Sequence, residues 1–357
     1  MSGKMRTTYS TFLRRALTTG LALVQQWRGR QVWSKFRNCR KACEWRYLKE
    51  LVPLESDHNL HFGAAIHECL ELWHRHRDLD RVLEHIDILY PERLGDEKQR
   101  ADWHLATAMM KGYAARYPEE DFEVVAMEKA FEERIVNPAT GASSRSFTLA
   151  GKVDGIVRQD GKYFLLEHKT ASQIDSGYLE RLWTDFQIQL YAWYVEKTLG
   201  WRISGVVYNI LAKAKLRQRQ GETEVEYEAR RAELIAKSKT GKTSAKRKMP
   251  ETDDEFQGRL TEWYAQPDAF HRELLYIPRD RFDTLRAELW ELTRSFLDAR
   301  RRGVFYQNTS QCFTYGRPCP YFQLCRSNGS PNVIENFYQH VPPNTELGEA
   351  AEDAPVF

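Results

Sequence analysis

The hydrophobic and polar positions along the chain predict a helical first third, followed by a mixture of strands and helices. Apolar residues recur at helical spacing in the segments 8–28, 34–50, 63–77, 79–89 and 96–117. Strand patterns follow near 122–134, 146–157 and 162–169, and after them come a helix around 186–194, a strand at 202–211 and a helix at 279–302. This order predicts an α/β fold in which helices flank a mixed central β-sheet, with a helical region at the N-terminus.

The same pattern divides the chain into four parts. We expect an N-terminal helix at 1–33, a helical region at 34–120, a sheet-containing core at 121–340 with a basic insertion at 213–250, and a disordered Pro- and Glu-rich tail at 341–357. Arginines interrupt the first helix, and no segment reaches the roughly 20 apolar residues that a bilayer-spanning helix needs. We therefore expect a soluble cytoplasmic protein without membrane contact.

A predicted β-hairpin carries two carboxylates and a lysine. Its turn is Asp160-Gly161, a pair that tolerates the positive φ angles of a tight loop, so Asp154 would face Glu167 across the ladder. Glu167 and Lys169 lie two residues apart and project from one face of an extended strand. Carboxylate oxygens suit Mg²⁺ or Mn²⁺, and a neighbouring lysine can orient an attacking water or stabilise phosphoryl charge. The alternative is a surface ribbon in which Glu167 and Lys169 form only a salt bridge.

Two predicted helices add polar residues to this arrangement. The apolar run 163–166 indicates a buried strand that delivers Glu167 to a cleft. Gln187 and Tyr191 lie one turn apart on one face of the helix that follows. His67 lies on an otherwise apolar helical stripe, where a packed core histidine is the simpler interpretation of that residue alone.

Taken in order, these motifs resemble the RecB-like branch of the PD-(D/E)XK nucleases, whose members carry a helix histidine, a Gly-x-x-Asp strand, a Glu-x-Lys strand and a Gln-x-x-x-Tyr helix. The resemblance implies a restriction-endonuclease-like core. It also implies ligands for a catalytic Mg²⁺ or Mn²⁺, which would be His67, Asp154, Glu167 and the backbone carbonyl of His168. Lys169 would be catalytic, and Gln187 and Tyr191 would contact DNA or support the site.

The resemblance implies a metal-dependent DNA nuclease, and an exonuclease that acts on free or single-stranded ends in recombination, repair or end processing in phage or prokaryotes. Recombination or replication proteins would be its partners. Two other classes stay open. One is a DNA-binding or scaffold protein of the same fold with an idle site, and the other is a hydrolase that uses paired carboxylates as acid and base, for which Lys169 is superfluous.

The six cysteines fall into two groups at opposite ends of the chain. Because no secretory signal is expected, metal ligation is a better interpretation than a disulfide framework. Three thiols lie in a Gly- and Pro-containing segment near the C-terminus, namely Cys312, Cys319 and Cys325. The fourth ligand could come from Cys39 or, as the alternative, from Cys43, whereas Cys69 lies among apolar residues and would be a core thiol.

The context of Cys39 resembles the N-terminal cysteine of the iron–sulfur members of the same nuclease family, among them the CRISPR spacer-acquisition nucleases and the AddB nuclease domain. That resemblance implies a [4Fe-4S] cluster that joins the two ends of the chain. The six residues between Cys312 and Cys319 exceed the spacing of those relatives. A tetrahedral Zn²⁺ site with the same four thiolates is the competing interpretation.

Charge and composition leave the interpretation of the basic insertion open. The chain has 357 residues, 42% of them hydrophobic, and a formal charge of only +3. Attraction for DNA must therefore come from local patches, of which the clearest begins at Lys213 and Lys215. The insertion could equally be a solvated helix or loop, because glutamates interrupt it. We expect its Lys-rich part at 236–249 to be a mobile loop that could clamp a phosphate backbone.

Overall fold

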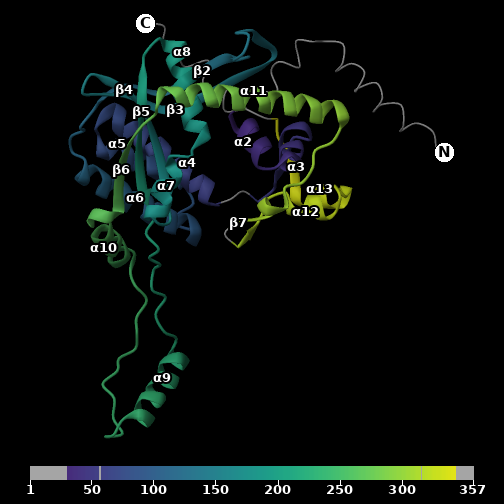
Figure 1. Ribbon diagram of the computed structural model, residues 1–357. Helices are drawn as coiled ribbons and strands as arrows, with labels where there is room; N and C mark the ends of the chain where they lie inside the picture. The colour runs from purple at the N-terminus through teal and green to yellow at the C-terminus, as the bar shows by residue number, and fades with distance from the viewer. Residues whose placement is uncertain (1–29, 56–57, 315, 343–357) are drawn as a thin grey trace, which may run out of the picture.

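The computed structural model describes residues 30–342 except 56–57 and 315. The helix expected at 8–28 and nearly all of the expected tail lie outside the described residues. At the centre is a five-stranded sheet with the order β2-β3-β4-β5-β6 (Figure 1). Its strands are β2 (Glu123–Val136), β3 (Ser143–Gln159), β4 (Lys162–Ala171), β5 (Ile203–Ala212) and β6 (Phe270–Tyr276). β4 and β5 are parallel and the other neighbours are antiparallel, so the expected mixed sheet is confirmed.

Helices cover both faces of this sheet (Figure 1). One face packs against α4 (His58–His76), α6 (Glu97–Arg116) and α10 (Asp253–Tyr264), and α5 (Leu79–Leu89) packs on α4 and α6. The other packs against α2 (Arg30–Asn38), α8 (Phe186–Leu199) and α11 (Arg279–Arg302). Because side chains alternate along a strand, Ile210 and Leu211 enter different cores, the first beside α8 and the second beside α4.

The hairpin that carries the candidate chemistry forms as the sequence predicts. Asp160 and Gly161 connect β3 to β4 with φ angles of 49° and 73°. The expected helix at 279–302 coincides with α11, and the expected helix at 79–89 coincides with α5. No helix in the described part of the chain is long and apolar enough to cross a membrane.

The helix expected at 34–50 is interrupted. α2 ends at Asn38, and Cys39 adopts an extended conformation with φ −156° and ψ 112°. The short α3 (Arg40–Cys43) and a π-helical turn (Glu44–Leu48) follow. In a continuous helix, the direction of the Cys39 side chain would be fixed by the helical repeat. The break at Cys39 therefore changes the direction in which its thiol points.

Several small elements are absent from the sequence prediction. α10 is the longest of them. The edge strand β6 was missed because residues 271–273 are charged or polar, as is common at sheet edges. At the ends of the described chain, β1 (Leu51–Pro53) pairs with β9 (Tyr338–His340). The remaining elements are α7 (Ser176–Leu182), β7 (Phe313–Thr314), β8 (Arg317–Pro318), α12 (Phe322–Arg326), α13 (Pro331–Phe337) and 3-10 turns at Pro267–Ala269 and Thr309–Gln311.

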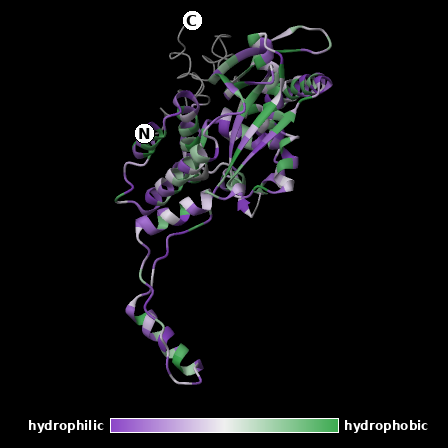
Figure 2. Cartoon of the chain, turned by 90° about the vertical axis from the view of Figure 1, so that its left-hand side faces the viewer, coloured by the Kyte–Doolittle hydropathy of each residue, from purple (hydrophilic) through white to green (hydrophobic). Residues whose placement is uncertain are grey.

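The basic insertion forms an arm, defined here as residues 213–252, that stands away from the rest of the protein (Figures 1 and 2). Two extended legs lead to α9 (Glu224–Lys237) at its tip. The arm therefore combines one helix with two non-helical legs. The Lys-rich segment after residue 237 forms the returning leg.

Candidate active site

The β3–β4 ladder opens at the candidate carboxylates. Gly155 pairs with Leu166 as the last regular pair of the ladder. One residue further on, the side chain of Asp154 replaces the backbone as acceptor, and its Oδ2 receives the N–H of His168 at 2.7 Å. β3 and β4 therefore separate from each other at Asp154 and Glu167, while β3 stays paired with β2 and β4 stays paired with β5.

His67 approaches the same carboxylate from α4, with its Nδ1 3.3 Å from Asp154 Oδ2. Burial favours a higher pKa for Asp154, but the hydrogen bond and charge of His67 outweigh it, so the pKa of Asp154 lies well below its ordinary value. For His67, burial favours a lower pKa, and the bond to Asp154 reverses the shift and raises it. Asp154 is therefore ionised and His67 is held against it.

Glu167 and Lys169 form the second half of the site. The Glu167 residue is 2% exposed, and its Oε1 lies 2.5 Å from Lys169 Nζ. Lys169 Nζ also lies 3.9 Å from Asp185 Oδ2. Asp185 is the N-cap of α8, where its side chain accepts the N–H of Gln187 at 3.1 Å. Lys169 thus connects β4 to the start of α8.

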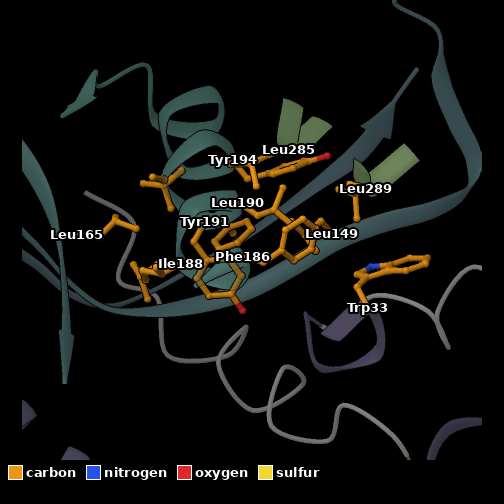
Figure 3. Close-up of a cluster of buried hydrophobic side chains, with 14 of the residues drawn as sticks. Trp33, Leu149, Leu165, Phe186, Ile188, Leu190, Tyr191, Tyr194, Leu285 and Leu289 are labelled. Atoms are coloured by element: carbon orange, nitrogen blue, oxygen red, sulfur yellow. The ribbon is translucent and has the colours of Figure 1, made fainter. Parts of the chain in front are cut away.

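Gln187 and Tyr191 occupy different environments although they lie one turn apart. Gln187 is half-buried in the first turn of α8, whereas Tyr191 is 1% exposed and lies in the core beside Phe186 and Leu190 (Figure 3). The Tyr191 ring passes directly over Gly151, where an added Cβ would come within 2.4 Å of the Tyr191 hydroxyl oxygen. Tyr191 therefore supports the sheet from inside the core.

A buried polar network, which sequence reasoning missed, lies behind the site. His168, Asn209 and Arg272 are register partners on β4, β5 and β6. Asn209 Nδ2 lies 2.9 Å from His168 Nδ1 and donates to the Tyr113 hydroxyl at 3.0 Å. Arg272 donates to the same hydroxyl at 3.0 Å and pairs with Glu120 at 2.5 Å. An asparagine inside the apolar strand β5 was the available signal.

The network fixes His168 in its neutral form. Burial lowers the pKa of His168 to about 3, although the charge of Asp154 opposes the shift. The imidazole stacks on His74 with ring centroids 5.3 Å apart. Since Asn209 donates to Nδ1, the ring proton lies on Nε2. The side chain of His168 therefore anchors β4 from behind, while its backbone N–H holds Asp154 in front.

The donor set fits a hard divalent ion in kind, because it combines two carboxylates, an imidazole and nearby backbone carbonyls. The distances between these donor groups, however, do not yet match those of a metal site. In the described part of the chain, no group of three or more His, Cys, Asp or Glu side chains is spaced to hold a metal ion. Asp154 instead accepts a backbone N–H and contacts His67, and Glu167 contacts the Lys169 ammonium.

A family model for the PD-(D/E)XK nuclease superfamily matches residues 32–326, which is most of the chain. The chain belongs to the PD-(D/E)XK nuclease superfamily. A search of curated proteins gives no match. Superfamily membership indicates a nuclease, which is a phosphodiester hydrolase that acts on DNA, and enzymes of this superfamily typically use Mg²⁺ or Mn²⁺. The match includes every candidate residue of the β3–β4 hairpin and of α8.

The cysteines of this superfamily member come from both ends of the matched region. Cys39, Cys319 and Cys325 pack around one small core that contains Trp45 and Tyr321. The expected four-thiolate site is nevertheless not formed as a metal-ligating group among the described residues. Two sulfurs accept protein hydrogen bonds instead, Cys39 from the N–H of residue 308 and Cys325 from Trp45 Nε1, both at 3.4 Å.

Cys43 and Cys69 lie in two other cores. Cys43 is fully buried in the core with Val32 and Trp33, and its Sγ lies 3.8 Å from the Val32 carbonyl oxygen. Cys69 is also fully buried, and burial raises the pKa of its thiol to about 12. Its place among Ile66 and Leu70 confirms the expected core thiol.

The basic residues at the start of the arm leave the sheet close to the end of β4. Lys213 donates its backbone N–H to the Ala171 carbonyl at the end of β4, at 2.7 Å. Its ammonium lies 4.8 Å from the centre of the Phe62 ring on α4. Lys215 is exposed two residues further along. The structure thus brings Lys213 beside α4 and leaves Lys215 on the arm.

Proposed function

We propose that this nuclease is a divalent-metal-dependent exodeoxyribonuclease that removes nucleotides from DNA ends. The observation that carries the proposal is the meeting of His67, Asp154, Glu167 and Lys169 at the open end of the β3–β4 ladder. Preference for ends, and a role in recombination, repair or end processing, follow from the resemblance of these motifs to the RecB-like branch.

In this proposal each residue has one task. Asp154, Glu167 and His67 would hold Mg²⁺ or Mn²⁺, with the backbone carbonyl of His168 as a further ligand. The bound ion would polarise the scissile phosphate and lower the pKa of a water molecule. Lys169 lies between the Glu167 and Asp185 carboxylates and would stabilise the charge that develops on the phosphoryl oxygens.

The remaining proposed contacts position the substrate. Gln187, half-buried in the first turn of α8, is suited to reach the DNA backbone beside Lys169. Tyr191 is buried and would not contact the substrate. It would support the site by packing against Gly151 on β3. Lys213 and Lys215 would contact phosphates next to the cleavage site.

Linear and covalently closed DNA of one sequence test the function. With Mg²⁺ or Mn²⁺ we expect nucleotides to be released from the linear duplex and the closed circle to stay intact, and EDTA should stop the reaction. Nicking of the circle would make the protein an endonuclease. Binding without hydrolysis would indicate the idle DNA-binding alternative, and hydrolysis that persists in EDTA would contradict metal dependence.

We also propose that Cys39, Cys312, Cys319 and Cys325 hold a [4Fe-4S] cluster, with structural Zn²⁺ as the alternative. Three of these thiols share one small core, and the Cys319 N–H donates to the Cys312 carbonyl at 2.8 Å, which keeps the fourth close. Hydrogen bonds to Cys39 and Cys325 are of the kind that tune ligated thiolates.

Metal analysis of protein purified without oxygen tests this proposed four-cysteine metal site. We expect about four irons per chain with a brown colour from thiolate-to-iron charge transfer, or else one zinc and no colour. Cys39→Ala should lose the metal, because its sulfur lies in the shared core. Cys43→Ala, four residues away in another core, is the matched control and should retain it. Wild-type protein with neither metal would rule out the four-cysteine metal site.

A further inference from the structure

The arm carries the positive charge of the whole protein. Residues 213–252 contain twelve Lys and Arg against six Glu, a net charge of +6, whereas the complete chain has a net charge of +3. The rest of the chain therefore has a net charge of −3. A polyanion such as DNA is attracted to the arm more than to the protein as a whole.

The glutamates of the arm are used within the fold. Glu222 forms a two-bond pair with Arg230, at 2.5 and 2.8 Å. Glu226 closes a capping box with Thr223 at the start of α9. The two legs are joined where the Glu222 N–H donates to the Lys248 carbonyl at 2.8 Å. These contacts give the arm a defined shape although α9 buries no residue.

Six exposed cations of the arm form no ion pair within the described residues. On the outgoing leg they are Lys215, Arg217 and Arg219, and on the returning leg Lys239, Lys242 and Lys246. The three on the outgoing leg alternate with the half-buried Leu216 and Gln218, so they share one side of an extended chain. We define these three as the outgoing row.

The outgoing row matches a nucleic-acid backbone in spacing. Two residues of extended chain advance about 6.6 Å, and successive phosphates of one strand advance about 3.4 Å along the duplex axis. Successive cations of the row can therefore face every second phosphate of one strand. The outgoing leg, ten residues from 213 to 222, spans at most about 33 Å, or about ten base-pair steps.

The arm begins at the candidate catalytic edge. Lys169 is the register partner of Ile210, and β5 continues for only two more residues before the arm starts. The Lys213 N–H still bonds to β4, at Ala171. DNA bound at Lys169 would therefore lie near the root of the arm.

We infer that the arm holds the backbone of duplex DNA on the side of the cleavage site that stays uncut, through the outgoing row and the cations of the returning leg. This inference deepens the proposed function and rests on it for the identity of the ligand. It accounts for a helix-tipped arm whose unpaired cations point to solvent, because phosphates supply the missing counter-charge.

Binding measured in EDTA tests the inference without requiring cleavage. The two arm variants are Lys215→Gln with Arg217→Gln and Arg219→Gln, and Lys239→Gln with Lys242→Gln and Lys246→Gln. The matched control removes three exposed lysines from elsewhere, as Lys111→Gln with Lys129→Gln and Lys162→Gln. All three variants lose the same charge, and fluorescence anisotropy of a labelled duplex gives the affinity over a range of salt concentrations.

The slope of log affinity against log salt changes by about 0.9 for each duplex phosphate contact that is lost. We expect each arm variant to reduce the steepness by up to about 2.7, and the control to leave it unchanged. Arm variants that match the control would overturn the inference. So would arm variants that change the oligomeric state in light scattering but leave the DNA slope unchanged, because the arm would then contact protein.

The same measurements separate this inference from the proposed function. A wild-type protein that binds duplex through the arm but never hydrolyses DNA would contradict the proposed nuclease activity and leave the arm's role intact. A protein that hydrolyses DNA with arm variants indistinguishable from the control would contradict the arm's role alone.

Discussion

Glu167→Gln should lower the rate of DNA cleavage by about a thousandfold while the protein stays folded. The substitution keeps the volume and one oxygen acceptor for Lys169, but it removes the negative charge that would bind the ion. A loss of roughly 4 kcal/mol of transition-state stabilisation corresponds to this factor, since each 1.36 kcal/mol is tenfold. Single-turnover cleavage of end-labelled duplex at saturating protein measures it.

The matched control is Asp160→Asn on the same hairpin. Asn tolerates the positive φ of 49° at that turn, so the variant loses a carboxylate without losing the turn. It should cleave DNA like the wild type. Equal activity of Glu167→Gln and the control would remove Glu167 from the site.

Titration with Mn²⁺ distinguishes ligand loss from loss of catalysis. Glu167→Gln should weaken ion binding, because a ligand is gone. Lys169→Met should retain ion binding and lose turnover, because the ammonium is expected to stabilise charge and not to ligate. If Lys169→Met instead weakened Mn²⁺ binding as much as Glu167→Gln does, Lys169 would be organising the ligands.

Local patterns explain why much of the fold could be predicted. The Asp160-Gly161 turn and the alternation on either side are short-range signals, and they determine that Asp154 and Glu167 meet. α11 has helical spacing over 24 residues and was predicted at the correct bounds. The family match supports the core that these signals indicate.

Long-range contacts explain most of what was missed. The polar row of His168, Asn209 and Arg272 forms because three strands align in one register. Arg272 is far from the other two in sequence, since the whole arm lies between β5 and β6. No local pattern relates Asn209 to Arg272. The break at Cys39 was missed for a similar reason. The Cys39 side chain packs in a core with Tyr321 and Leu324, which come from the other end of the chain.

The arm illustrates a different limit. Its basic composition was visible, but its glutamates made a solvated helix or loop as acceptable as a patch that contacts DNA. The capping box at Thr223 and Glu226 was a readable helix start. What the sequence did not show is which cations are neutralised, because the Glu222–Arg230 pair depends on the folded geometry.

Gly151→Ala should destabilise the protein by about 3 kcal/mol, the upper part of the usual range for overpacking a core. An added Cβ would lie 2.4 Å from the Tyr191 hydroxyl oxygen and 2.5 Å from the ring carbon that carries it. The ring cannot withdraw easily, because it packs edge-on against Phe131 with centroids 4.8 Å apart. Urea denaturation with comparison of midpoints at equal m-values measures the change.

A double-mutant cycle shows whether the ring is the cause. Tyr191→Leu alone should cost a few kcal/mol for the space that it leaves. In that background Gly151→Ala should cost much less than it does alone, giving a coupling energy of more than about 1 kcal/mol. Gly258→Ala is the matched control, on an exposed face of α10 with no atom within 4 Å of the new Cβ, and should be neutral or slightly stabilising.

The functional consequence of Gly151→Ala follows from its distance to the carboxylate. Gly151 lies three residues before Asp154 on β3, so pushing α8 away from the strand also shifts Gln187 and Asp185 relative to Asp154 and Lys169. Cleavage should fall under conditions where the variant is still folded, and Tyr191→Leu should restore part of it. Additive effects on stability and no recovery of cleavage would show that Gly151 acts through a contact other than Tyr191.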